Sequence, residues 1–347
     1  MLKLVGLDRG QGHTQLTLQP HLESDLLPAG EKVAKGRRRR SDGISCPEKA
    51  AMGVNSLIIL ATSPVKSENW VNLNLFLDKT QLKDVCLKFC GDLKVYNEIT
   101  GIQTCTSAHP CYACEARRDP RTGEWIGVPA PLRTHSRNLA HYNEWLAGGG
   151  GVDGGRQGLR LAKEHCNVVA EPLLGKSEPD KPLLLLLVPG ALHLKLGVVN
   201  SALELLKENW DGLEDWLRAR GIQYVPYHGV VLEGNECSKV INDLADLELH
   251  LPEHLKPFSA YLRAFGAVMS SSFGLVPRES WEEDIVGMKQ EFLNLHHLFG
   301  LSHTPKLHII FQHIPDFIRW DYSITTDYNL LICKALGSLT KSVNIPG

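Results

Sequence analysis

The residues best suited to chemistry in this sequence are two pairs of metal-binding types that lie far apart. Cys111 and Cys114 form a CxxC segment, a spacing that lets two thiolates of one tight turn occupy two corners of a tetrahedron. His308 and His313 lie five residues apart near the other end of the chain, within the range of paired zinc histidines. These types and spacings favour one zinc ion that joins two distant segments.

Other interpretations of the same residues stay open from spacing alone. Cys105 and His109 lie close to the CxxC segment, so this loop offers more ligands than one metal ion needs. Cys111 and Cys114 are also compatible with two buried reduced thiols, and the histidines with satisfied core residues. The chain contains 15 histidines, and a pair at this spacing can arise by chance.

The elements that would position these residues begin with a series of short apolar segments. Three strands are predicted first, then a helix, then a fourth strand that is followed by Gly91 and Asp92, which is the front half of an α/β unit. The predicted strands are 1–7, 14–18, 56–61 and 85–90, and the helix is 69–82.

Beyond this front half the pattern is mainly helical. A loop rich in cysteine, histidine and proline covers 105–119, and the glycine-rich segment 148–155 is typical of a linker. Helical spacing of apolar residues follows in several segments. The predicted helices are 131–146, 192–216, 258–268 and 281–297.

Composition places the chain among soluble globular proteins of one large or two smaller domains. Its 347 residues are 43% hydrophobic and 22% charged, with a formal charge of -2, so a DNA-binding surface would have to be local. The longest apolar run, 183–188, is too short to cross a bilayer, and no secretory signal is evident, which predicts an intracellular protein with no membrane partner. Six further cysteines show no spacing for a second metal site and are interpreted as structural: Cys46, Cys86, Cys90, Cys166, Cys237 and Cys333.

Several short segments carry a resemblance when they are taken in order. They are GLDRG (6–10), FCGD (89–92), the CxxC segment, THSRNLAHYNEW (134–145), YHGVVLEGN (227–235) and the histidine pair followed by IPD (314–316). Together they resemble the catalytic core of the recombination-activating protein of V(D)J recombination and of the related Transib-type transposases. The resemblance runs in patches through nearly the whole chain.

This resemblance implies a fold and a site. The fold would be α/β, a ribonuclease-H-like core interrupted by a large, mostly helical zinc-binding insertion. It implies a front half at 1–104, the insertion at 105–317 and a truncated or divergent tail at 318–347. Asp8 and Asp92 match the two catalytic aspartates, which would bind Mg²⁺ or Mn²⁺, while Cys111, Cys114, His308 and His313 match the structural zinc ligands.

The family also implies partners and a location. The partners are DNA and a second copy of the chain, and the location is the nucleus. Separately, the run Arg37–Arg40 is compatible with a nuclear localisation segment, a phosphate clamp or a solvated loop. The family's catalytic glutamate has no counterpart, since 321–347 contains Asp321 and Asp327 but no glutamate. We therefore expect a truncated or degenerate member with impaired catalysis. The alternative is a non-catalytic zinc-stapled module that binds DNA or protein.

Overall fold

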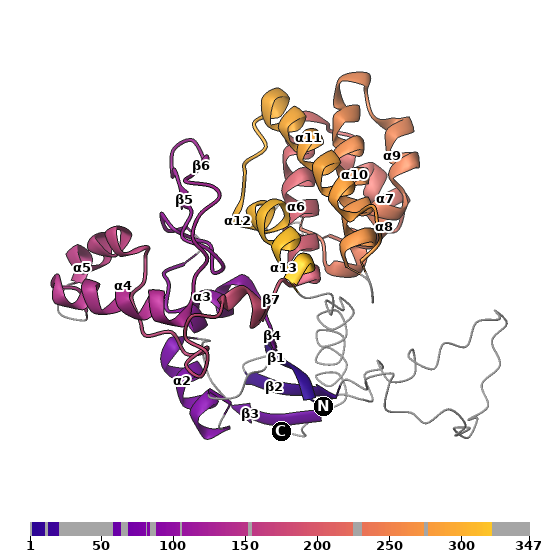
Figure 1. Ribbon diagram of the computed structural model, residues 1–347. Coiled ribbons are helices and arrows are strands. Elements are labelled where there is room, and N and C mark those ends of the chain that lie inside the picture. The colour runs from indigo at the N-terminus through magenta and orange to yellow at the C-terminus, as the bar shows by residue number, and fades with distance from the viewer. Residues whose placement is uncertain are drawn as a thin grey trace, which may run out of the picture.

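The computed structural model describes residues 2–10, 13–20, 58–63, 69–80, 82–83, 88–104, 106–151, 155–224, 231–273 and 277–320. Within these residues the chain is mainly helical, with one five-stranded and one two-stranded sheet. Figure 1 shows a cluster of helices above the larger sheet, and two further helices that project to the other side. No helix in the described ranges combines the length and the apolar character that crossing a membrane requires.

The larger sheet begins with three antiparallel strands that follow one another in the chain. They are β1 (Leu2–Gly10), β2 (His13–Pro20) and β3 (Ile58–Ser63). Each pairs with the next, as Asp8 with Gln15 and Gln15 with Thr62. The three predicted strands are confirmed, and the predicted helix after them is α2 (Trp70–Lys79).

Two short parallel strands complete this sheet in the order β3-β2-β1-β4-β7. β4 (Lys88–Cys90) pairs with β1, and β7 (Leu187–Val188) pairs with β4. α3 (Leu93–Thr100) starts directly after β4. The prediction recognised β4 but not β7, which comes from the middle of the chain and follows a 3-10 turn at Leu183–Leu185.

The middle of the chain carries a small hairpin and a pair of helices. The hairpin strands are β5 (Arg117–Arg118) and β6 (Trp125–Ile126), and the helices are α4 (His135–Ala147) and α5 (Gly155–Leu161), followed by the 3-10 turn η4 (Ala162–His165). Thr134 caps α4, because its Oγ1 accepts a hydrogen bond from the amide of Arg137. The glycine-rich segment after α4 is packed at Gly150, where a Cβ would lie 2.3 Å from the ring of Trp145.

Six helices form the cluster above the sheet. They are α6 (Ala191–Asn209), α7 (Leu213–Ala219), α8 (Gly234–Asn242), α9 (Leu244–His250), α10 (Lys256–Ser272) and α11 (Trp281–Phe299). A 3-10 turn at Glu253–Leu255 leads into α10. The prediction of one helix over 192–216 was wrong, because the structure has two helices there. The first of them ends before Trp210, whose backbone is extended (φ -150°, ψ 109°).

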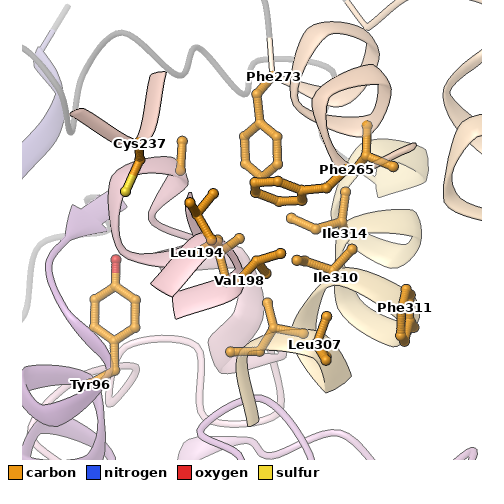
Figure 2. Packing of buried hydrophobic residues seen from close by; sticks show 14 of the residues in the cluster. Tyr96, Leu194, Val198, Cys237, Phe265, Phe273, Leu307, Ile310, Phe311 and Ile314 are labelled. Carbon is orange, nitrogen blue, oxygen red and sulfur yellow. The ribbon is translucent and has the colours of Figure 1, made fainter. Parts of the chain in front are cut away.

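The last described segment lies against this cluster. It consists of α12 (Pro305–His308), a π-helical turn η7 (Ile309–His313) and α13 (Ile314–Trp320). Figure 2 shows Leu307, Ile310 and Ile314 on the side of this segment that faces Leu194 and Val198 of α6. These apolar side chains hold the segment on the helical cluster.

Candidate metal centre

The cysteine side of the centre is a buried turn whose carbonyl groups are hydrogen-bonded by one arginine. Cys111 and Cys114 are each 1% exposed, and the amide of Ala113 approaches the Cys111 Sγ at 3.4 Å. Arg133 is fully buried, and its Nε donates to the carbonyl oxygens of Cys111 (2.8 Å) and Cys114 (3.0 Å). The guanidinium therefore satisfies the carbonyls of the turn while both sulfurs stay available on the other side.

The histidine side depends on the π-helical turn. On an ideal α-helix of 3.6 residues per turn, residues five apart point about 140° away from each other. His308 and His313 lie at the two ends of a segment with π-helical geometry, in which bonds join residues five apart. The turn therefore brings both imidazoles onto the same side, with their Nε2 atoms 3.2 Å apart.

The four side chains converge on one point. The Cys114 Sγ lies 3.3 Å from the His308 Nε2, and the Nε2 atoms of the two histidines are 3.2 Å apart. One ligand atom from each of the four residues lies within 4.8 Å of the others. Ordinary zinc bond lengths in a tetrahedron require about 3.3 Å between two nitrogens and about 3.8 Å between two sulfurs. The four buried donors can therefore hold a metal ion.

The acidities of the two thiols favour loss of the Cys111 proton first. Burial raises the pKa of Cys111, but hydrogen bonds from the Cys114 thiol and from two backbone amides outweigh it and hold this pKa below its usual value. The hydrogen bond to Cys111, together with burial, raises the pKa of Cys114 to about 11. The Cys111 proton is therefore the easier one to lose, and a bound cation would displace the protons of both thiols.

Asp316 lies behind one of the two histidines. Its carboxylate Oδ2 is 3.6 Å from the His313 Nδ1, beyond hydrogen-bond distance, while the Nε2 faces the cluster. Burial alone would lower the pKa of His313, but Asp316 and Cys114 outweigh it and raise the pKa to about 9. A carboxylate behind a ligating imidazole is the usual outer partner in protein metal sites.

A tryptophan covers the other histidine. The rings of Trp125 and His308 are stacked, with centroids 3.7 Å apart and planes 10° apart. The Trp125 Nε1 donates to the carbonyl of His303 at 3.0 Å, and the Arg118 Nε donates to the same carbonyl at 3.1 Å. The β5–β6 hairpin thus attaches to His303 and His308 through contacts that need no metal.

The alternative ligands are placed differently. The His109 Nδ1 lies 2.9 Å from the backbone carbonyl of Glu115, and His109 is not part of the cluster. Cys105 lies outside the described residues. Cys90 and Cys237 are buried away from the cluster, whereas Cys166 belongs to a different group of possible ligands.

The two predicted catalytic aspartates come from neighbouring parallel strands. Gly6 of β1 pairs with Cys90 of β4, and each aspartate follows two residues later. The backbone therefore brings Asp8 and Asp92 to the same end of the sheet. The Asp92 side chain caps α3, where its Oδ1 accepts a hydrogen bond from the Val95 amide at 2.7 Å. Asp321, Asp327 and Arg37–Arg40 lie outside the described residues.

Two residues that the sequence analysis did not single out stabilise the cysteine turn and the neighbouring strands. Arg133 joins the turn of the two cysteines to Cys166, whose carbonyl accepts from its Nη2 at 2.8 Å. The buried hydroxyl of Tyr96 donates to the carbonyl of Val188 and accepts from the Gly91 amide at 2.8 Å, which ties β7 to the end of β4. A single arginine or tyrosine carries no spacing pattern in the sequence, so neither role was predictable.

Comparisons with known proteins add no relative. No model of a known protein family matches the chain, and no curated protein matches it either.

Proposed function

We propose that the four-residue cluster binds one structural Zn²⁺ and that the chain is a transposase- or recombinase-derived DNA-binding protein, which resembles a DDE strand transferase with impaired catalysis. In this proposal the larger sheet is a ribonuclease-H-like core and the helical cluster belongs to its zinc-binding insertion. The protein acts in the nucleus and, by analogy with the family, as a homodimer.

The observation that carries the proposal is the convergence of Cys114 and His308, which are 194 residues apart in the chain. Two thiols and two imidazoles are the ligand set of structural zinc sites, which keep no open position for a substrate. Zinc at this point would crosslink the cysteine turn, which follows Asp92 in the chain, to the histidine segment that follows the helical cluster. That is the position that the family resemblance assigns to it.

The arrangement of the sheet adds a second support. A two-metal site needs carboxylates on rigid elements that hold two cations about 3.5–4 Å apart. Asp8 and Asp92 each lie two residues after Gly6 and Cys90, which pair between two parallel strands, and these neighbouring backbone positions support the proposal. The missing glutamate removes one anionic ligand, and loss of one member of a catalytic group costs orders of magnitude in rate.

A non-catalytic binding module is the second candidate, and one contact favours it. The Asp92 carboxylate already accepts the Val95 amide, so it has an ordinary role as the cap of α3. A capping carboxylate needs no metal ion to be stable. In this candidate the zinc centre is structural and DNA or protein binds elsewhere on the surface.

The test combines metal content, DNA binding and cleavage on the full chain. Metal analysis should find zinc that is lost in Cys111→Ser, and fluorescence anisotropy with labelled duplex DNA should show affinity that falls steeply with salt. A supercoiled plasmid with Mg²⁺ or Mn²⁺ should remain uncut.

Each result separates the candidates. Cleavage that Asp8→Ala abolishes would show an active enzyme and overturn the impairment. Zinc without DNA affinity would leave the protein-binding module. A stable protein without zinc would remove both candidates.

A further inference from the structure

A second group of metal-binding side chains lies next to the first centre and is distinct from it. Glu115 follows Cys114 in the chain, His141 lies on α4, and Cys166 follows η4. A carboxylate oxygen, an imidazole nitrogen and the thiol sulfur of these three residues all lie within 4.8 Å of one another. No spacing in the sequence indicated this group, because its three residues lie far apart in the chain.

We propose that Glu115, His141 and Cys166 bind a second Zn²⁺ ion, with three protein ligands and a fourth position open to water. Thiolate, imidazole and carboxylate are the three side-chain ligands that zinc takes in proteins. Sites with three protein ligands exchange their metal and their fourth ligand more readily than closed four-ligand sites. The inference is independent of the DNA-binding proposal.

The contacts of Glu115 leave a place for the ion. Its side chain is only 9% exposed, and the Arg137 Nη2 holds the Oε2 at 2.7 Å. The Oε1 faces the His141 Nε2 at 3.2 Å and also accepts from the Arg137 Nε at 2.9 Å. Arg137 thus contacts both oxygens, and the Oε1 would ligate the metal through a second lone pair while the arginine fixes the orientation of the carboxylate.

The backbone at Cys166 is held in an unusual conformation. Cys166 and Asn167 have positive φ angles of 51° and 59°, which side-chain-bearing residues rarely adopt. Such strain persists only where surrounding contacts fix it and is common at functional sites. Arg133 binds the Cys166 carbonyl, and the Asn167 amide donates to Ala162 at 2.7 Å. These contacts keep the thiol beside His141.

The charges around His141 also favour a cation. Hydrogen bonds to Cys166 and Glu115 raise the pKa of His141 to about 9, and burial only partly opposes them. Burial raises the pKa of Glu115, but hydrogen bonds from His141 and Arg137 outweigh it and bring the pKa to about 2. The Glu115 carboxylate is thus an anionic group beside His141, which also suits a cation at this position.

Glu144 and His165 lie next to the three ligands. The Glu144 Oε2 is 3.9 Å from the His141 Nδ1 and 3.4 Å from the His165 Nδ1. Both stay outside the first ligand shell in this proposal, because the three residues that bind are the more enclosed set. Glu144 can orient His141 from behind, on the ring nitrogen that the metal does not use.

The experiment measures metal content and thiol protection on the full chain. Mass spectrometric metal analysis should find two zinc ions per chain in the wild type and one in Cys166→Ser or His141→Ala. The control Cys237→Ser, which changes a buried cysteine remote from the site, should retain two. A mild chelator should remove one zinc ion without changing the circular dichroism, and alkylation of Cys166 should then become faster by about tenfold or more.

Refilling the emptied site gives a readout that needs no variant. Co²⁺ should restore protection of Cys166 and produce a thiolate-to-cobalt absorption band, which Cys166→Ser lacks. One zinc ion per chain that only Cys166→Ser removes would support this site and refute the first one. Zinc content unchanged by Cys166→Ser, with the same alkylation rate at all metal concentrations, would overturn the proposal.

Discussion

The centre formed by Cys111, Cys114, His308 and His313 and the acidic end of the larger sheet differ in how their polar atoms are used. In the centre, donors from distant segments face one another, and the Cys114 Sγ and the His313 Nε2 lie 3.3 Å and 3.2 Å from the His308 Nε2. At the end of the sheet, the Asp92 carboxylate is engaged by the first turn of α3. We infer from this difference that metal ligands from distant segments that meet at one point indicate metal binding more strongly than acidic residues at strand ends do.

The largest expected effect is loss of a ligand from the centre. Cys111→Ser should release zinc and lower the free energy of unfolding by about 5 kcal/mol or more, a large part of the stability of a typical domain. The cause is that zinc binds the folded chain and crosslinks it. Metal analysis and urea unfolding would measure this.

Cys90→Ser is the matched control, because Cys90 is buried in β4 and outside the cluster. It should keep its zinc. Equal zinc content in Cys111→Ser and the wild type would show that the centre does not bind the metal.

Replacement of the buried arginine should have the next largest effect. Arg133→Met leaves the carbonyls of Cys111, Cys114 and Cys166 without their donor, and each unsatisfied buried group costs about 1–3 kcal/mol. We expect a loss of about 3–5 kcal/mol in unfolding free energy and weaker retention of zinc during chelator competition. Arg218→Met, at an exposed ion pair, should change stability by less than about 1 kcal/mol. Similar stability of the two variants would contradict a role for Arg133 in holding the cysteine turn.

Removal of the ring that covers His308 should act on the centre more mildly. Trp125→Leu loses the stacking contact and the hydrogen bond to the His303 carbonyl, with a cost of about 2 kcal/mol, because the side chain is only partly buried. All four ligands remain, so the zinc content should be unchanged while a chelator removes the metal faster. Unchanged release kinetics would show that the hairpin does not protect the centre.

Local patterns in the sequence predicted the front of the sheet and the ligand types, but tertiary contacts decided the rest. Apolar runs were sufficient to predict β1 and β3, and alternation of apolar and polar residues was sufficient for β2, because each of these patterns lies within one short segment. β7 has only two residues and pairs across almost a hundred positions, so no local pattern indicates it. The spacing of His308 and His313 suggested a pair, but the π-helical turn that aligns them was not predictable from that spacing.

The smallest expected effect concerns Asp92 at the acidic end of the larger sheet. Asp92→Asn keeps an oxygen that can cap α3, so its stability should fall by only a few tenths of a kcal/mol, whereas Asp92→Ala should lose about 1 kcal/mol. Thermal unfolding of the two variants measures this structural role.

The same pair of variants separates the cap from a metal ligand. If Asp92 also binds Mg²⁺ or Mn²⁺, then Asp92→Asn should abolish the stabilisation that these ions give the wild type, because an amide replaces an anionic ligand. Wild-type stability that does not respond to either ion would assign Asp92 to the helix cap alone. Stabilisation that is lost equally in Asp92→Asn and Asp8→Asn would instead place both carboxylates in one cation site and weaken the contrast with the buried centre.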